Sequence, residues 1–344
     1  MNKKKVILLY GAIGMITIIF ITIGLIFKKT DLEKLNGLTD IYDISSEGDI
    51  AYVSYDKGKS GIYLKSKNGD GLLTEYNEEK IIEDISFVQD ENLLVYSLID
   101  RELDSDNVSS IHVLDITNGA NRKLHESNGI ITEVVADPKD VGIVYLLKAT
   151  SYENYSPIAR MAPHNFDLYQ YDLGMNQETR LTYWDKYSMH SLNISATEEF
   201  AYVQMVDDDA ANSAEDIFDA KQKIFQIPLK NPNERKIISN ENREADIYDF
   251  AFLQDKSGII FQSASNYAAG DTFKYELYFQ DLESKEEIQL TELEEYTGRP
   301  IFSKNDEKIY FIVDKAFAKK HPDYYLYKMD KDGKNIEEIQ LKYR

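Results

Sequence analysis

The stretch FSKNDEKIYF at residues 302–311, followed by LYKMD at 326–330, contains the pattern that decides the fold. An apolar strand leads through a polar turn into a second strand that ends on an aromatic residue. A third strand then opens on an apolar residue and, in most copies, an aromatic one, and this order of features occurs six times along the chain. The second strands end near Tyr52, Tyr96, Tyr145, Tyr202, Phe261 and Phe311. The third strands open at Ile62-Tyr63, Ile111-His112, Leu168-Tyr169, Ile224-Phe225, Leu277-Tyr278 and Leu326-Tyr327.

A repeat of about 45 to 60 residues that is built of strands alone is typical of a β-propeller. A fourth, outer strand closes the units, most clearly at Leu72-Leu73-Thr74, Arg180-Leu181-Thr182 and Ile288-Gln289-Leu290-Thr291. The sequence therefore predicts an all-β domain over residues 38–344, a six-bladed β-propeller with four-stranded antiparallel blades. The first and last units each hold four strands of their own, so we expect the ring to close by side-chain packing between them.

These repeats resemble the TolB-type (WD40-like) propeller family, whose units read aromatic-Ser-x-Asp-Gly-x-x-Ile-x-Phe, then Ile-Tyr-x-x-Asp, then Leu-Thr. Residues 302–311 and 326–330 match this pattern, and so do residues 277–281 with Leu290-Thr291. No unit retains the full Ser-Pro-Asp-Gly turn, and Pro228 stands where the fourth unit would carry Asp. Together with the apolar run near the start of the chain, described below, the resemblance identifies the sequence as a membrane-anchored bacterial member of the family. It implies the fold and not the ligand, because such propellers bind unrelated partners.

The first residues of the chain differ from the repeats. An uncharged run at residues 6–27 lies between three lysines, at 3–5, and two more at 28 and 29. Its 22 residues would form a helix of about 33 Å, enough to cross a bilayer core of about 30 Å. We expect a cytoplasmic tail (1–5), a transmembrane signal-anchor helix (6–27), a stalk (28–37) and an extracytoplasmic C-terminal domain. The alternative is a cleaved signal peptide, but this run is longer than usual for one and no small-x-small site follows it.

Composition excludes several classes of function. The chain has a net charge of −21, which repels nucleic acid and anionic lipid headgroups. It has no cysteine, so disulfides, thiolate nucleophiles and cysteine-based zinc sites are excluded, as is a lipid anchor on cysteine. The predicted helix is the one membrane attachment that the sequence indicates.

The connection between the second and third strands is short in unit one and longer in the other five. In a propeller these connections share one face with the links between blades. Insertions that gather on one face usually bind there. The connection in unit three and the link that follows it are rich in residues that anchor interfaces. The predicted ligand-binding residues are Tyr152, Tyr155, Arg160, His164, Trp184, Tyr187 and His190. The alternative is that they pack the long connections onto the ring.

Metal sites are weakly indicated. Asp207, Asp208 and Asp209 form a carboxylate cluster that could hold calcium, but the EF-hand spacing is missing, so a solvated acidic loop is the alternative. The sequence predicts no other cofactor. A basic cluster, Lys315, Lys319, Lys320 and His321, could pair with that loop. Three further histidines, His125, His164 and His190, could meet on one face and bind a metal with a carboxylate.

The sequence contains neither a G-x-S-x-G elbow nor an H-E-x-x-H pair, so it favours a binding protein over an enzyme. We expect a platform that binds a protein, peptide or glycan of the cell envelope through the face with the long connections. One alternative is a metal-dependent hydrolase, similar to a lactonase, with its site at the mouth of the channel. The other is a structural subunit of an envelope complex.

Overall fold

The computed structural model describes residues 13–17, 20, 22, 30–88, 92–103, 107–154, 161–197, 199–213, 216, 219–253, 257–268 and 272–342. From residue 30 onward these form the short 3-10 helix η1 (Leu32–Lys34) and strands that follow one another in units of four. Unit one contains β1 (Gly37–Ile44), β2 (Ile50–Asp56), β3 (Lys59–Ser66) and β4 (Gly69–Glu75). Unit two contains β5 (Lys80–Val88), β6 (Leu93–Asp100), β7 (Val108–Asp115) and β8 (Asn121–Asn128). Unit three contains β9 (Ile130–Ala136), β10 (Ile143–Asn154), β11 (Met161–Asp172) and β12 (Gln177–Arg180).

The second half of the chain repeats the arrangement with shorter outer strands. Unit four contains β13 (Met189–Ile194), β14 (Phe200–Val206), β15 (Gln222–Pro228) and β16 (Lys236–Ile237). Unit five contains β17 (Phe250–Phe252), β18 (Gly258–Ala264), β19 (Tyr275–Asp281) and β20 (Glu287–Gln289). Unit six contains β21 (Tyr296–Ser303), β22 (Lys308–Asp314), β23 (Tyr324–Met329) and β24 (Glu337–Glu338).

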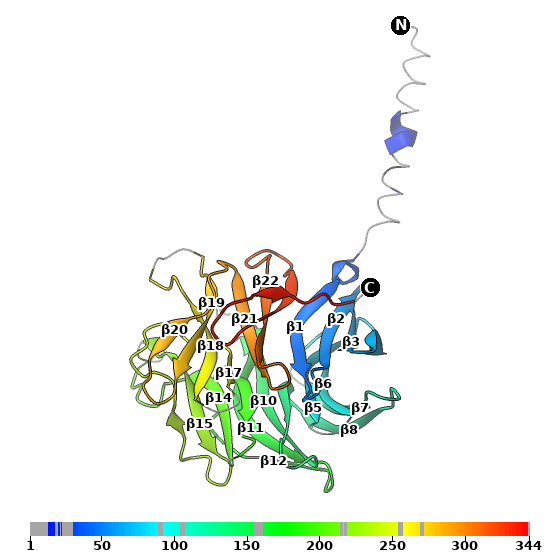
Figure 1. Cartoon of the computed structure of the whole chain (residues 1–344). Helices are drawn as coiled ribbons and strands as arrows, with labels where there is room; N and C mark the ends of the chain where they lie inside the picture. The colour runs from blue at the N-terminus through cyan, green and yellow to red at the C-terminus, as the bar shows by residue number, and fades with distance from the viewer. Residues whose placement is uncertain are drawn as a thin grey trace, which may run out of the picture.

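Within each unit the strands pair antiparallel in chain order. Units one to four are separate four-stranded sheets, and units five and six are joined into one sheet by a single parallel pair, Tyr275 with Tyr296. Figure 1 shows the units following one another around the molecule, so that β1 of the first lies beside β21 and β22 of the last. The predicted all-β fold with four-stranded antiparallel, blade-like sheets is confirmed.

Apolar clusters join each unit to the next. Separate clusters lie between units one and two, two and three, three and four, four and five, and five and six. A sixth lies between units six and one, where Tyr52, Ile312 and Leu326 are almost fully buried. Second strands are apolar on both sides because each sheet packs against a neighbour on either face. The six clusters therefore make a cycle, as side-chain closure requires.

The end of the described chain adds a second closure, which the sequence did not predict. Residues 339–342, the C-terminal latch, leave unit six and lie on unit one (Figure 1). Two apolar residues of the latch pack against the cluster between these units. The Tyr52 hydroxyl donates to the Lys342 carbonyl at 2.9 Å, and the Lys342 N–H donates to Asp70 of β4 at 3.0 Å. The latch thus ties the last unit to inner and outer strands of the first.

The first strands of five units are interrupted at the same place. Each carries extra residues opposite its partner strand, and such bulges bend a strand and redirect a side chain. The interruptions lie between Leu38 and Tyr42, between Ile82 and Asp84, between Ile131 and Glu133, between His190 and Asn193, and between Gly298 and Ile301. The bulges line the axis of the ring and position the polar groups described below.

The Leu-Thr sequence at the outer strand has a defined structural role. Thr182 accepts a hydrogen bond from the N–H of Leu168 at 2.9 Å and donates one to Asp167 at 2.6 Å. The Asp167 carboxylate is completely buried. Thr291 repeats the arrangement and donates to the buried Glu276 at 2.5 Å. The hydroxyl satisfies a buried carboxylate on the third strand, which explains why the motif recurs.

Replacing Thr182 by Val should therefore lower the free energy of unfolding by about 1–3 kcal/mol, because a buried carboxylate and a buried N–H each lose a partner. Thr182→Ser keeps the hydroxyl and should lose less than about half of that. Urea denaturation of the two variants measures the difference. Equal losses for Val and Ser would show that the methyl group, and not the hydroxyl, is what matters.

In unit three, residues 148–154 and 161–166 lie in strands, where the sequence predicted a long loop between the second and third strands. β10 and β11 continue past the sheet as a protruding hairpin, pairing from Ala149 with Phe166 to Asn154 with Met161. Tyr152 packs on the cluster between units three and four, and His164 is buried, so the hairpin gains apolar contacts along its length. This burial explains why the strands continue.

The predicted transmembrane segment, residues 6–27, falls for the most part outside the described residues, and the predicted tail, 1–5, does so entirely. In the part of the chain that the structure describes, no helix is long and apolar enough to cross a membrane.

Candidate functional site

A cavity of about 580 Å³ lies on the axis of the ring. First strands of all six units line it, together with the turns that join first to second strands, among them Glu47, Pro138, Ala196 and Lys304. These turns lie at the opposite ends of the strands from the connections between second and third strands. The cavity, which we call the axial pocket, therefore opens on the face with the short turns.

The wall and the inner end of the axial pocket differ in chemistry. The wall carries apolar side chains from several units, including Ile44, Phe87, Ile194, Phe252 and Phe302. The inner end carries five polar side chains at or beside the strand bulges: Asp84, Glu133, Ser191, Asp249 and Arg299. Such a combination of apolar wall and few polar groups is typical of ligand pockets.

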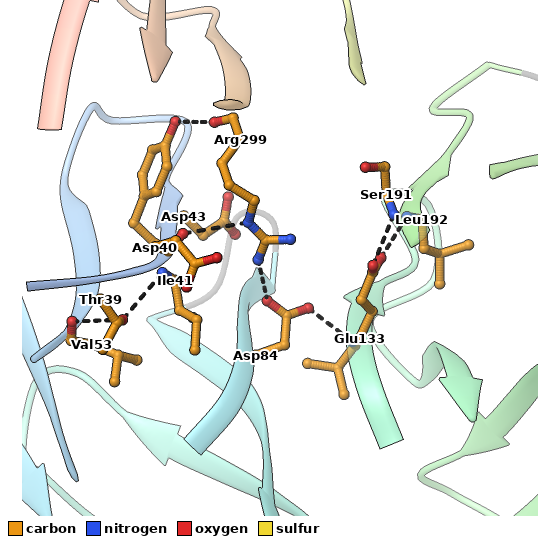
Figure 2. A network of polar contacts seen from close by, with 12 residues as sticks. Thr39, Asp40, Ile41, Asp43, Val53, Asp84, Glu133, Ser191, Leu192 and Arg299 are labelled. Carbon is orange, nitrogen blue, oxygen red and sulfur yellow. Dashed lines mark hydrogen bonds and ion pairs between the residues drawn. The ribbon is translucent and has the colours of Figure 1, made fainter. Parts of the chain in front are cut away.

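The polar groups at the inner end first serve to connect the units. Asp84 of unit two accepts a hydrogen bond from the N–H of Val134 of unit three, at 2.9 Å. Glu133 of unit three accepts bonds from the N–H groups of Ser191 and Leu192 of unit four, at 2.8 and 2.6 Å. The carboxylates thus satisfy N–H groups at or next to the bulge of the next unit. Figure 2 shows these contacts.

The same chain of contacts continues through units four, five and six. The Ser191 hydroxyl bonds to Asp249 at 2.8 Å, and Asp249 accepts a bond from the N–H of Arg299 at 3.1 Å. Ser191 and Arg299 both have positive φ, 55° and 53°, in a region that residues other than glycine seldom adopt. The strained backbone is held by these bonds at the two bulges.

Arg299 closes the circuit across the axis. Its guanidinium lies 3.5 Å from Asp84 and donates a hydrogen bond to the carbonyl of Asp40 in unit one at 3.4 Å (Figure 2). The backbone carbonyl of Arg299 in turn accepts a hydrogen bond from the Tyr42 hydroxyl at 2.6 Å. Among the described side chains at the inner end it is the one basic group. Arg299 therefore contacts units one and two from unit six.

Buried acids outnumber this cation. Burial raises the pKa of Asp84 to about 8, although Arg299 opposes the shift and Glu133 adds to it. Burial likewise raises the pKa of Asp43, on the pocket wall, to about 6. Burial works against the charge of Arg299, yet Asp40 and Asp249 outweigh it and raise the pKa of the guanidinium. Near neutral pH, some of the buried carboxyl groups that exceed the single guanidinium are therefore protonated and uncharged.

The predicted ligand residues that the structure describes lie on the other face, near the hairpin of unit three. The segment that links units three and four runs beside β11, because Phe166 and Lys186 exchange two backbone hydrogen bonds. This contact places the ring of Tyr187, which is 46% exposed, 6.5 Å from that of the buried His164. The structure thus brings these two predicted residues together. Tyr155 and Arg160 lie outside the described residues.

Two further predicted residues mainly support the link. Trp184 packs against the cluster between units three and four, and the guanidinium of Arg235 lies 4.1 Å from its ring centre. His190 is exposed, 6.0 Å from the ring of Phe166 and 3.9 Å from Glu133. For Trp184 the packing alternative fits better than direct ligand contact.

The acidic cluster of unit four is paired. Lys186 forms ion pairs with Asp208 and, at 3.1 Å, with Asp209, while Arg235 binds Asp209 at 2.5 Å. The neighbouring Asp207 donates its N–H to the carbonyl of Lys221 at 2.9 Å. The basic cluster of unit six pairs elsewhere, with Lys315 on Glu338 and Lys320 on Asp31. Within the described residues, no three His, Asp or Glu side chains are grouped so that they could hold a metal ion.

Sequence reasoning missed the polar groups of the axial pocket. Their types differ from unit to unit, so no repeated residue marks them. A weaker signal exists, because in several units an Asp, Glu or Arg stands immediately before the apolar run with which the first strand ends. Glu133, Asp249 and Arg299 are the clearest cases.

Comparison with known proteins gives likeness in structure alone. No family model matches the chain, and no curated protein matches it. TolB from Acinetobacter baumannii superposes with a TM-score of 0.55 at 13% identity, over 85% of this chain and 76% of that one. An oligogalacturonate lyase in complex with manganese gives 0.54 at 11%, over 87% and 78%. A structure of the nidogen/laminin complex gives 0.53 at 11%, over 79% and 86%. At such low identity these likenesses show the fold, which is a β-propeller of the TolB type.

Proposed function

We propose that this chain is a six-bladed, membrane-anchored propeller that binds a protein or peptide of the cell envelope, and that the ligand enters the axial pocket. The observation that carries the proposal is the pocket itself, since it is the place where all six units converge. The likeness in fold to TolB and to a structure of the nidogen/laminin complex supports a binding role.

The dimensions and chemistry of the pocket favour a narrow, amphipathic ligand. A volume of about 580 Å³ fits a few side chains and not a folded domain. The apolar wall accommodates an aliphatic or aromatic body, and the polar inner end provides both carboxylates and a guanidinium for its tip. A peptide segment or chain terminus has this form. A glycan would find less to bond along the apolar wall.

The pocket carboxylates are suited to structure more than to chemistry. Glu133 and Asp249 each bond to N–H groups of the following unit, which fixes their orientation and occupies their lone pairs. A hydrolase or lactonase would require such groups to hold a metal or to transfer protons. The enzyme and the structural subunit remain the alternative predictions.

The test uses the full chain in lipid nanodiscs and a displayed library of random 12-residue peptides as the probe. Ala196, exposed at the pocket mouth, is replaced by Trp to obstruct entry; Ala268, exposed in the connection between β18 and β19 on the other face, is the matched control. We expect selected peptides to bind Ala196→Trp at least tenfold more weakly and Ala268→Trp as strongly as the original chain.

The outcome decides between faces as well as between functions. If the selected peptides bind Ala268→Trp more weakly than the original chain but bind Ala196→Trp equally well, the axial pocket is not the binding site. The site would then lie on the face with the long connections. A library that yields no binder to the original chain would count against a peptide ligand altogether.

A further inference from the structure

The stalk that joins the predicted membrane helix to the propeller is fastened to the ring. The carbonyl of Leu35 accepts a hydrogen bond from the N–H of Gly58 at 3.0 Å, and the side chain of Asn36 accepts one from the N–H of Lys57 at 2.9 Å. Gly58 has a φ of +86°, and a Cβ there would lie 2.8 Å from the carbonyl oxygen of Leu32. The stalk therefore packs closely on the turn between β2 and β3.

The contacts of the stalk begin at Thr30, the first of its residues that the structure describes. Thr30 and Glu33 cap each other reciprocally, with bonds of 2.7 Å from the Thr30 N–H and 3.1 Å from the Glu33 N–H. Asp31, the residue before η1, pairs with Lys34 of η1 at 2.8 Å and with Lys320 of unit six at 3.3 Å. These contacts hold η1 between units one and six. The chain from Thr30 onward is thus part of the ring and not a flexible linker.

The position of this attachment determines from which face of the ring the N-terminal segment extends. The turn between β2 and β3 belongs to the face with the long connections, and Figure 1 shows η1 at the rim beside β1, where the connection from β22 to β23 also projects. The axial pocket opens on the opposite face. A membrane helix that precedes η1 would therefore approach the face away from the pocket.

The apolar run ends very close to this attachment. Phe27 precedes the ordered Thr30 by three residue steps, which span at most about 11 Å. Lys28 and Lys29 lie in that interval, where a helix leaves the hydrocarbon core. So short a connection cannot let a propeller turn over, and it keeps the face beside η1 near the headgroups.

That rim carries side chains that suit a membrane interface. Tyr267 and Phe273, in the connection between β18 and β19, are 46% and 42% exposed. Phe317, in the connection of unit six, packs on Tyr296 at 5.0 Å, and the exposed Lys319 and Lys320 follow it. Aromatic rings and lysines are the residues that membrane–water interfaces favour, and lysines attract anionic headgroups even in a chain of net negative charge.

We propose that the rim around η1, formed by the stalk and the connections of units five and six, rests on the lipid bilayer surface, so that the axial pocket points away from the membrane. This inference rests on the membrane anchoring in the proposed function. It assigns separate tasks to the two faces: one holds the ring against lipid headgroups, and the other stays open to the ligand.

The absence of cysteine allows a direct test, since a single introduced thiol is the only labelling site. Ala268→Cys and Lys319→Cys mark the face with the long connections, and Ala196→Cys is the matched control at the pocket mouth. Each full-length variant, carrying a bimane label, is reconstituted in vesicles of three parts phosphatidylcholine to one part phosphatidylglycerol with nitroxide-labelled headgroups. Quenching is then compared among the three positions.

We expect the labels at 268 and 319 to be quenched at least threefold more strongly than the label at 196. Equal quenching at all three, in a protein that floats with the vesicles, would overturn the orientation and leave anchoring intact. A chain that does not float with vesicles would show that anchoring itself fails, and the orientation with it. Stronger quenching at 196 would reverse the assignment of the two faces.

Discussion

Ending the chain after Glu338 is expected to lower the free energy of unfolding by about 3–5 kcal/mol, since two half-buried apolar side chains and several hydrogen bonds to unit one are lost together. The residues removed include the C-terminal latch, 339–342, which covers the cluster between units six and one. Thermal and urea unfolding of the truncated chain measure the loss.

Two single substitutions separate the apolar contacts of the latch from its hydrogen bonds. Leu341→Ala removes apolar contact and should cost about 1–2 kcal/mol, because the side chain is only partly buried. Tyr52→Phe removes the hydroxyl that donates to Lys342 and should cost about 1 kcal/mol. Ile288→Ala is the control, since Ile288 is 61% exposed on an outer strand and should change stability by less than about 0.5 kcal/mol. A truncated chain as stable as the original would show that packing between units six and one closes the ring unaided.

Replacing Arg299 by Leu is expected to destabilise the ring by about 3–5 kcal/mol at pH 8, because removal of one partner leaves buried carboxylates without their cation. Arg299 is the group that most strongly opposes the rise in the pKa of Asp84 caused by burial, and it also donates a hydrogen bond to unit one. Urea unfolding at pH 5 and pH 8 measures the penalty. Arg122→Leu, which removes the same charge from an exposed site on β8, is the control and should cost less than about 0.5 kcal/mol.

The sign of the pH dependence follows from the raised pKa values. Burial raises the pKa of Asp84 from 3.8 to about 8 and that of Asp43 from 3.8 to about 6. Between the unfolded and the folded pKa of each group, the folded chain holds a proton that the unfolded chain has released. The contribution of these two protonated carboxyl groups to the free energy of unfolding is therefore full below about pH 4 and falls as the pH rises to about 8. Without Arg299 the pKa of Asp84 rises further, so the fall in stability continues to higher pH and the penalty is larger at pH 8 than at pH 5. A penalty for Arg299→Leu that is the same at pH 5 and pH 8 would contradict this account.

The repeat units could be read from the sequence because their pattern depends on local chemistry. Each second strand is buried on both sides, and Tyr310 and Phe311 lie in β22 as the pattern at 302–311 predicts. The extended hairpin of unit three could not be predicted in the same way. Tyr152 and His164 stand in a segment of mixed polarity, and what makes it strand is contact with the next unit.

The candidate site was less predictable than the fold. Neighbouring units supply the partners of Asp84, Glu133 and Asp249, so the role of each depends on residues about fifty positions away. The aromatic residues of the long connections instead predicted a binding site on the other face. Contacts across the axis, which no local pattern encodes, turned out to build the pocket.

The position of the latch also determines the order in which the ring can be completed. Each unit from two to six meets its predecessor as soon as it is synthesised, but the first unit must wait for a neighbour that follows it by about 250 residues. Synthesis at about 5–20 residues per second makes that delay ten seconds or more. During this interval Tyr52 and Leu38 present an apolar sheet face to solvent or to chaperones. The latch follows all six units in the sequence, so a nascent chain that stalls before unit six is complete would remain an open arc, recognisable to proteases by that uncovered face.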